Sequence, residues 1–295
     1  MRKHLTRRSI FKATIPARNR PFNPPYRPEG EQGEGEWEEL GLENKEANLK
    51  GKVAIVTGAS RGLGKAMAIH LARAGAAVAA AARTVEAGQS PLPGTIHETV
   101  QEIEREGGRS IGVRCDVTQE EDAEHLISHV TEIFGQVDIL INNAGVTTPE
   151  SFLKLSTKKW DLVMNVNLKG SFLCTRAVLP QMVERRSGHI INVSSVLAKR
   201  IQFSIPYGAS KAAIERFTLG LAKEMKKHNV AVNALCPDFT VTEAVTTFLK
   251  DVDTTGWQGS EMWAKYAVLV ATHGAGRLTG RILDEAALVE IFGPV

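Results

Sequence analysis

The fold of this chain is decided by the stretch Val53-Ala-Ile-Val-Thr-Gly-Ala-Ser-Arg-Gly-Leu-Gly64. Its beginning, Val53-Ala-Ile-Val56, is a continuous apolar run, which is typical of a short strand buried on both faces of a parallel sheet. The glycine-rich turn that follows leads into residues 65–74, which we expect to form a helix closed by Gly75. Glycines let a ligand approach the backbone, and the start of a helix offers free N–H groups and a positive dipole end. The turn therefore indicates a dinucleotide-phosphate site, although its spacing Gly58-x-x-x-Gly62-x-Gly64 departs from the plain GxGxxG pattern.

Strand-like and helix-like segments alternate through the rest of the chain. Further strands are expected at 78–82, 110–114, 137–141, 189–193, 230–235 and 281–283, a loop and helix at 93–106, and helices at 120–134, 160–185 and 207–227. This alternation implies right-handed crossovers and an α/β fold, a doubly wound parallel sheet with helices on both faces. The sequence shows no internal repeat and no second domain, so we expect a single domain over 49–295.

The composition is that of an ordinary globular protein, with 43% hydrophobic and 23% charged residues. The formal charge of +3 is too small to indicate nucleic-acid binding, and no apolar run approaches the ~18 residues of a membrane helix. The three cysteines, Cys115, Cys174 and Cys236, lie far apart. Their spacing fits neither a disulfide framework nor a zinc site, so we expect buried thiols, no metal and a reducing compartment, the cytoplasm.

Residues 1–48 differ from the rest. The first twenty carry seven Lys or Arg and no acid, 21–28 are rich in proline, and 29–46 are acidic. Such segments cannot bury enough apolar surface to offset their ordering entropy, which predicts a disordered tail. Thr6-Arg-Arg-Ser-Ile-Phe-Lys12 invites interpretation as a twin-arginine export signal, but no apolar region follows it at 13–28. An Arg-rich start also permits an organelle transit peptide, and that alternative stays open.

The end of the second strand bears on the choice of cofactor. An acidic residue there would bind the ribose 2′-hydroxyl of NAD, whereas an arginine accommodates the 2′-phosphate of NADP. The chain has Ala81-Ala-Arg-Thr84 at this point, and Arg61 in the glycine turn is a second nearby cation. Two cations and no carboxylate favour NADP, although a solvated Arg83 would leave room for NAD. After the third strand, Asp116 is placed to meet the adenine edge, or else to act as the N-cap of the next helix.

The segment that suggests catalysis runs from Ser194 to Lys211. Tyr207 and Lys211 are four residues apart at the start of a predicted helix, so they share one face. A nearby cation favours phenolate, and we expect it to lower the tyrosine pKa from its usual ~10 toward the working pH. A phenol of this kind can take and return protons. Ser194 and Ser195, at the end of the preceding strand, are placed to hold a substrate oxygen against it.

Taken together, the motifs resemble the short-chain dehydrogenase/reductase family over 49–283. The resemblance rests on Thr57-Gly-Ala-Ser-Arg-Gly-Leu-Gly64, Asp116-Val117, Asn142-Asn-Ala-Gly145, Val166-Asn-Leu168, Ser194-Ser195 and Tyr207-Gly-Ala-Ser-Lys211, in that order. It implies a Rossmann-type fold with a helical substrate lid, and hydride transfer between a nicotinamide and an alcohol or carbonyl carbon.

The resemblance also implies roles for individual residues. Tyr207 matches the catalytic acid/base, and Lys211 the lysine that holds the nicotinamide ribose and lowers the tyrosine pKa. Ser195 matches the substrate-orienting serine when counted forward from Asn167, whereas counting back from Tyr207 would select Ser194. Asn167 matches the asparagine that completes a proton relay through water; Asn165 does not, and Asn142 is expected to be structural. The residues expected to bind the cofactor are Gly58, Ser60, Arg61, Gly62, Leu63, Gly64, Arg83, Asp116, Val117, Asn143, Ala144, Gly145, Tyr207, Lys211, Pro237, Thr240 and Thr242.

Three segments depart from the family pattern. After the sixth strand Asp238 stands where the family has glycine, so a side chain there would crowd the nicotinamide end or contact the substrate. The loop at 89–96 is longer than usual, and the ending at 278–285 lacks the common small residues. Substrate choice is expected to lie with the aromatic-rich lid at 238–266, which indicates an apolar substrate, unless its aromatics only pack the lid onto the core.

These features together predict an NADPH-dependent carbonyl reductase. Two rival functions stay open, a cofactor-binding regulator on the same fold, and an isomerase or epimerase with no net redox change. The expected partner is a small alcohol or carbonyl compound, with no nucleic acid and no membrane. The helices at 160–185 and 207–227 commonly mediate dimers and tetramers in the family, so a homo-oligomer is expected.

Overall fold

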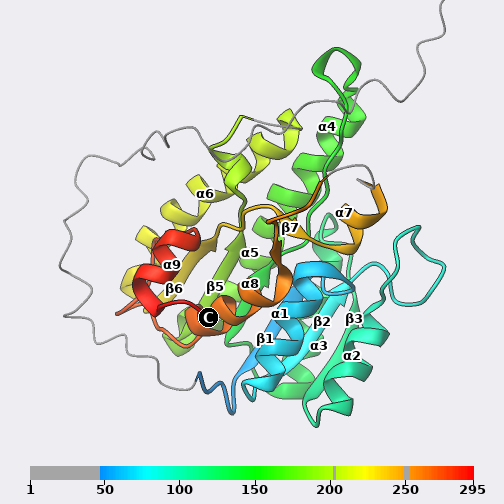
Figure 1. Ribbon diagram of the computed structural model, residues 1–295. Helices are drawn as coiled ribbons and strands as arrows, with labels where there is room; N and C mark the ends of the chain where they lie inside the picture. Colours follow the sequence, from blue (N-terminus) through cyan, green and yellow to red (C-terminus); the bar gives the residue numbers. More distant parts are fainter. Residues whose placement is uncertain (1–46, 202–203, 249–252) are drawn as a thin grey trace, which may run out of the picture. The chain divides into compact units, whose positions relative to one another are not determined.

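Seven parallel strands form one sheet in the order β3-β2-β1-β4-β5-β6-β9 (Figure 1). They are β1 (Val53–Thr57), β2 (Ala77–Ala82), β3 (Arg109–Arg114), β4 (Ile139–Asn142), β5 (Gly188–Val193), β6 (Val230–Leu235) and β9 (Ile282–Leu283). The strand order reverses between β1 and β4, which is where ligands bind in sheets of this kind. The predicted α/β doubly wound sheet is therefore confirmed, and all seven expected strands are present.

The structure is a computed structural model that describes residues 47–201, 204–248 and 253–295. These residues belong to one compact unit, Gly35–Val295. The predicted disordered tail lies outside the described residues up to position 46, and so do positions 249–252 of the predicted lid.

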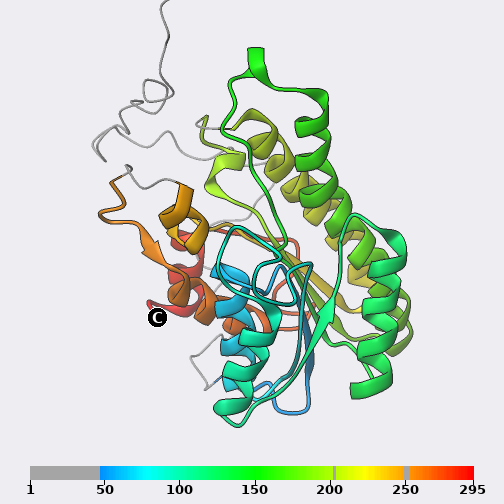
Figure 2. The ribbon, with the colours of Figure 1, turned by 90° about the vertical axis from the view of Figure 1, so that its right-hand side faces the viewer.

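Helices cover both faces of the sheet, which Figure 2 shows nearly edge-on. One core lies between the sheet and α1 (Gly62–Arg73), α2 (Ile96–Arg105), α8 (Ser260–Ala271) and α9 (Glu285–Phe292). The other lies between the sheet and α3 (Glu120–Phe134), α5 (Gly170–Arg185) and α6 (Ile205–Met225). The predicted lid contains α7 (Glu243–Phe248) and a separate strand pair, β7 (Thr240–Val241) with β8 (Gln258–Gly259).

The sequence explains why these elements form. All five residues of β1 are buried, as expected of a central strand covered on both faces. Thr95 and Glu98 form a reciprocal capping box that starts α2. Gly135 ends α3 in the left-handed conformation. Local signals and burial therefore agree in placing these elements.

Two local expectations were wrong. The segment 160–185 is not one regular helix, because α4 (Thr157–Met164) and α5 are separated by a π-helical turn, Asn165–Lys169. Such a turn inserts a residue into the helix and often marks a functional site. Asp116 is not the N-cap of α3, because Gln119 holds that position and Asp116 instead accepts hydrogen bonds from the backbone N and Oγ1 of Thr118.

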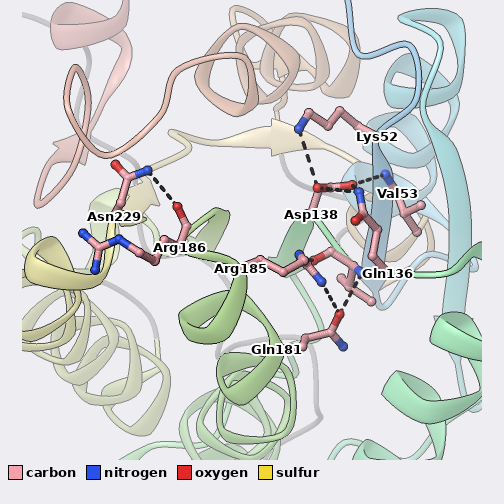
Figure 3. Close-up of polar contacts among 9 residues, drawn as sticks. Lys52, Val53, Gln136, Asp138, Gln181, Arg185, Arg186 and Asn229 are labelled. Atoms are coloured by element: carbon pink, nitrogen blue, oxygen red, sulfur yellow. Dashed lines mark hydrogen bonds and ion pairs between the residues drawn. The ribbon is translucent and has the colours of Figure 1, made fainter.

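Polar contacts fasten the amino ends of the central strands (Figure 3). Asp138, just before β4, accepts a hydrogen bond of 2.9 Å from the backbone N of Val53 and two more from Gln136 Nε2. Arg185, the last residue of α5, donates to the backbone O of Val137 at 2.6 Å. These contacts tie β1, β4 and α5 together at the end of the sheet opposite the glycine turn.

Candidate active site

The glycine turn is packed so closely that its glycines admit no side chain. A Cβ on Gly58, whose φ is +67°, would lie 2.8 Å from the Cα of Ala144. A Cβ on Gly64 would lie 2.3 Å from the backbone O of Gly58 and 2.3 Å from Asn143 Nδ2. The turn after β1 therefore lies directly against the segment after β4, at the reversal of the strand order.

The start of α1 has the properties of an anion site. Its N-cap, Arg61, makes no side-chain capping hydrogen bond, and the first turn holds no acidic residue. Gly62 has φ +56°, a conformation that favours glycine. Helix N-termini with free N–H groups bind phosphates. The residues present therefore fit the pyrophosphate of a dinucleotide, with Ser60 buried and Leu63 partly buried beside the turn.

The two cations predicted to bind a 2′-phosphate differ in their surroundings. Arg61 donates from Nε to the backbone O of Pro93 at 2.7 Å and from Nη2 to that of Gly94 at 2.9 Å. It thus fastens the long loop before α2 to the glycine turn. Arg83 is exposed at the end of β2 and has no hydrogen-bond or ion-pair partner within the described residues. Arg83 is therefore the cation left available to a ligand.

The segment after β4 braces the turn and borders the reacting end. Asn143 Nδ2 donates to the backbone O of Thr57 at 3.0 Å, and the backbone N–H groups of Asn143 and Ala144 both donate to Thr57 Oγ1. A Cβ on Gly145 would lie 3.8 Å from Lys211 Nζ, so this glycine leaves space in front of the lysine.

Three other predicted residues have mainly structural contacts. Val117 is buried against α5, because a Cβ on Gly170 would lie 2.6 Å from its Cγ2. Asp116 shapes the turn after β3, as described above. Asn142 is buried and donates to Asn192 Oδ1 at 2.9 Å, in agreement with the structural role expected of it.

Tyr207 and Lys211 lie in the first two turns of α6. The helix starts early because Ser204 caps it, accepting a hydrogen bond from the backbone N of Tyr207, and Pro206 occupies its first turn. Lys211 Nζ donates to the backbone O of Val193 at 2.6 Å and lies 5.4 Å from the centroid of the Tyr207 ring. The Ser195 hydroxyl accepts a hydrogen bond from the backbone N of Leu197 and is close enough to the phenol of Tyr207 to affect its pKa.

Burial sets the pKa values of this pair. It raises the pKa of Tyr207 to about 12, and the nearby Ser195 hydroxyl offsets only part of that rise. It lowers the pKa of Lys211 to about 8. The expectation of a lowered Tyr207 pKa is therefore wrong for this structure, because burial of the phenol raises the pKa and Lys211 is not among the groups that lower it.

Asn167 lies in the π-helical turn and its side chain is fully engaged. Oδ1 accepts from the backbone N of Val146 at 2.8 Å, while Nδ2 donates to Val146 O at 3.1 Å and to Ser210 Oγ at 2.9 Å. Ser210 in turn donates to the backbone O of Tyr207. The turn thus connects the segment after β4 with the start of α6.

Ser194 faces away from the phenol. Its Oγ donates to Glu215 Oε1 at 3.0 Å, and Cys236 Sγ donates to the same oxygen at 3.7 Å. Burial raises the pKa of this carboxyl. Sequence reasoning missed Glu215, although its position one helical turn after Lys211 was a signal that could have indicated it.

The segment after β6 carries the unusual Asp238. Its Oδ1 lies 3.1 Å from Arg200 Nη1 and accepts from the backbone N of Phe239 at 2.8 Å. The backbone O of Pro237 accepts from Val196 N at 3.0 Å. Asp238 therefore joins the loops after β5 and β6.

Two of the residues predicted to bind the cofactor lie near the start of the lid. Thr240 is in β7, and Thr242 directly precedes α7. Thr242 Oγ1 accepts from the backbone N of Val245, as an N-cap would. Phe239 stacks on Trp257 with centroids 5.0 Å apart, whereas Trp263 is fully buried. The lid aromatics thus divide between packing α8 onto the core and forming a stacked pair beside β7 and β8.

The described residues contain neither a cluster of metal ligands nor a helix suited to a membrane. No group of three or more His, Cys, Asp or Glu side chains among them is arranged to hold a metal ion. Within the same residues, no helix is both long and apolar enough to cross a membrane.

Comparison with known proteins gives consistent matches. The sequence model of the short chain dehydrogenase family matches residues 52–253. Dehydrogenase/reductase SDR family member 1 of Mus musculus is 34% identical over 269 residues, which cover 84% of this chain and 83% of the mouse protein. A 3-oxoacyl-[acyl-carrier-protein] reductase of Synechocystis is 38% identical over 196 residues, covering 66% and 76%. The crystal structure of a short-chain type dehydrogenase/reductase from Mycobacterium marinum superposes with a TM-score of 0.73 at 29% identity, covering 84% of this chain and 96% of that one.

Proposed function

This chain belongs to the short-chain dehydrogenase/reductase family and is an oxidoreductase of alcohol or carbonyl groups, and we propose that it is an NADPH-dependent carbonyl reductase. One observation carries the proposal. Lys211 Nζ lies 5.4 Å from the centroid of the Tyr207 ring, Ser195 is close enough to the phenol to lower its pKa, and Gly145 leaves space in front of the lysine.

The protonation of this pair supports reduction. With a pKa of about 12, Tyr207 carries its proton at neutral pH and can donate it to a carbonyl oxygen that Ser195 holds. Lys211, with a pKa of about 8, is mostly charged at neutral pH and can resupply that proton through water. The proposed part of Asn167 is to position this relay, since its amide is hydrogen-bonded to Val146 and Ser210. The nicotinamide cofactor, when bound at the glycine turn, supplies the hydride.

The choice of NADP over NAD is supported by the end of β2. Ala81 and Ala82 have no carboxylate that could bind a ribose 2′-hydroxyl. Arg83 is exposed and has no hydrogen-bond or ion-pair partner within the described residues. Arg61 contributes positive charge nearby while its Nε and Nη2 hold the loop. We expect a 2′-phosphate to be bound mainly by Arg83.

The substrate is proposed to be a ketone or aldehyde with an apolar group. The stacked Phe239 and Trp257 lie in the lid that follows β6, and aromatic side chains of this kind favour apolar ligands. Relatives named for different keto compounds, 3-oxoacyl-[acyl-carrier-protein] and 2-dehydro-3-deoxy-D-gluconate, show that sequence similarity alone leaves the compound open.

We also propose that the protein forms a homo-oligomer and that it works in the cytoplasm. The outer faces of α5 and α6 carry an apolar groove, which supports self-association. The three cysteines are buried free thiols, which supports a reducing compartment.

The test compares oxidation of NADPH and NADH over a panel of ketones, aldehydes and quinones, using wild-type protein, Tyr207→Phe and Tyr266→Phe. Tyr266 is a matched control, because its hydroxyl donates to the backbone O of Gly293 elsewhere in the fold. We expect a preference for NADPH, a loss of at least about 100-fold in turnover for Tyr207→Phe, and little change for Tyr266→Phe.

Other outcomes would support the rivals. Substrate conversion without net NADPH consumption would indicate an isomerase or epimerase. Dinucleotide binding with no turnover in any variant would indicate a regulator. A preference for NADH would overturn the argument from Arg83.

A further inference from the structure

The lid touches the glycine turn beside Gly62. A Cβ built on Gly62, the first residue of α1, would lie 3.3 Å from Thr242 Cγ2 and 3.4 Å from Glu243 Oε2. Figures 1 and 2 both show α7 beside the end of α1 at which the glycine turn enters it. A carboxylate of the lid therefore lies where the helix offers its free N–H groups.

Electrostatics favours this placement. The first turn of α1 contains no acidic residue, and its N-cap residue Arg61 provides no capping side chain. An anion from elsewhere in the chain is therefore attracted to the positive end of the helix dipole. Burial lowers the pKa of the Arg61 guanidinium, and the carboxylate of Glu243 opposes part of that shift. The carboxylate of Glu243 thus places negative charge both beside the amino end of α1 and near the guanidinium of Arg61.

The carboxylate is held loosely. Within the described residues Glu243 Oε1 and Oε2 accept no hydrogen bond, whereas its backbone O accepts one from Thr246 Oγ1. A displaced carboxylate would therefore lose only long-range attraction. A dinucleotide pyrophosphate makes directed hydrogen bonds to the same helix end and carries more charge.

We propose that Glu243 competes with the cofactor's pyrophosphate for the amino end of α1, so that binding of the dinucleotide displaces the lid from the glycine turn. This inference rests on the proposed function, because it concerns how tightly the same site holds its cofactor. Glu243 is then a residue that weakens cofactor affinity and couples it to the position of α7.

A different role for Glu243 predicts the opposite result. An acidic residue in the first turn of a helix stabilises that helix, and Glu243 is the first residue of α7. If this were its whole effect, removing the charge would loosen the lid and leave cofactor binding unchanged or weaker. Competition instead predicts that removing the charge strengthens binding.

The experiment measures dissociation constants for wild-type protein, Glu243→Gln, Glu243→Asp and Glu261→Gln. Glu261 is the matched control, because it lies in the first turn of the next lid helix, α8, and pairs with His70 of α1 at 2.9 Å. NADPH and NADH are titrated by their own fluorescence. ADP-ribose, which keeps the pyrophosphate, and adenosine, which lacks it, are titrated by competition.

We expect Glu243→Gln to bind NADPH, NADH and ADP-ribose about tenfold more tightly, as removal of one nearby charge predicts. The gain should shrink at high salt, and adenosine should bind equally to all variants. Glu243→Asp and Glu261→Gln should resemble the wild type. If Glu243→Gln binds ADP-ribose equally or more weakly than the wild type, the competition by Glu243 is ruled out and the proposed function still stands. If no variant binds any dinucleotide, the proposed function is overturned.

Discussion

Two adjacent hydroxyls after β5 point into different surroundings. Ser195 lies close enough to the phenol of Tyr207 to affect its pKa, whereas Ser194 donates to Glu215. We expect Ser195→Ala to lower turnover about 100-fold, because the substrate oxygen loses a donor, and to lower stability slightly, because the backbone N of Leu197 loses the capping hydroxyl. Ser194→Ala should instead destabilise the fold by about 1–2 kcal/mol, because a partly buried carboxyl loses a partner.

Turnover and thermal unfolding of the two variants, measured on the same preparations, check this assignment. Each serine is the control for the other, since both substitutions remove one hydroxyl at neighbouring positions. Full turnover in Ser195→Ala, together with a large loss in Ser194→Ala, would reverse the roles and favour the count made backward from Tyr207.

At this scale the sequence predicts residue types better than their energies. The order of the motifs was enough to predict that Tyr207, Lys211 and Ser195 lie close together, because Ser195 follows a strand end and the other two lie at the start of a helix. It could not predict the raised pKa of Tyr207, because desolvation depends on everything packed around the phenol. Nor could it show that Arg61 is engaged by the loop before α2, since that contact joins backbone carbonyls about thirty residues away.

Among the elements, β5 carries a buried histidine that should make stability depend on pH. The Nε2 of His189 lies 2.9 Å from Asn233 Nδ2 of β6, and Nδ1 has no partner within the described residues. Burial lowers the pKa of His189 to about 3, and the charge of His273 acts in the same direction. The unfolded chain, with a histidine pKa near ~6.5, therefore binds more protons between these two values.

The free energy of unfolding should consequently fall as the pH drops from 6.5 toward 3. The contribution of His189 approaches about 1.4 kcal/mol per pH unit in that range and vanishes above it. Urea unfolding at several pH values measures the slope, with His189→Gln as the comparison, because glutamine can accept from Asn233 without titrating. An identical pH slope in the two proteins would contradict this origin.

The elements also show where periodicity stops being informative. The apolar pattern over 160–185 predicted one helix, and helical residues do run from α4 to α5. A single inserted residue hardly changes that pattern, so the π-helical turn could not be seen in it. The turn is stabilised instead by distant contacts of Asn167, with Val146 and Ser210. Elements whose signals are local, such as α3 and β6, were predicted with their observed ends.

For the whole molecule, parallel strands explain how residues far apart in the chain meet. The glycine turn, Asn143, Ser195 and Pro237 follow β1, β4, β5 and β6, whose carboxyl ends lie at one edge of the sheet. This assembly was predictable from the strand order alone. The lid itself was predicted at 238–266, but its contact with Gly62 was not, because that contact depends on a segment that has few strand or helix signals of its own.

The outer surface of the molecule also has a feature that favours self-association. An apolar groove on the outer faces of α5 and α6 is lined by Phe172, Leu179, Pro180, Val183, Phe217 and Leu221. Phe172 is 43% exposed, so its ring adds apolar surface to the groove that is open to solvent. A second copy of the chain would cover this face by packing its own α5 and α6 against it.

We therefore expect the wild-type protein to sediment at a multiple of its 32.1 kDa chain mass, and Phe172→Glu to sediment as a monomer, because a buried unpaired carboxylate would destabilise the interface. The matched control is Val289→Glu in α9, which is 40% exposed but lies on the other side of the sheet. Sedimentation equilibrium at micromolar concentration distinguishes the cases. A monomeric wild type, or dissociation caused equally by Val289→Glu, would rule out α5 and α6 as the interface. Circular dichroism checks that Phe172→Glu is still folded, so that a lower sedimenting mass can be attributed to dissociation and not to unfolding.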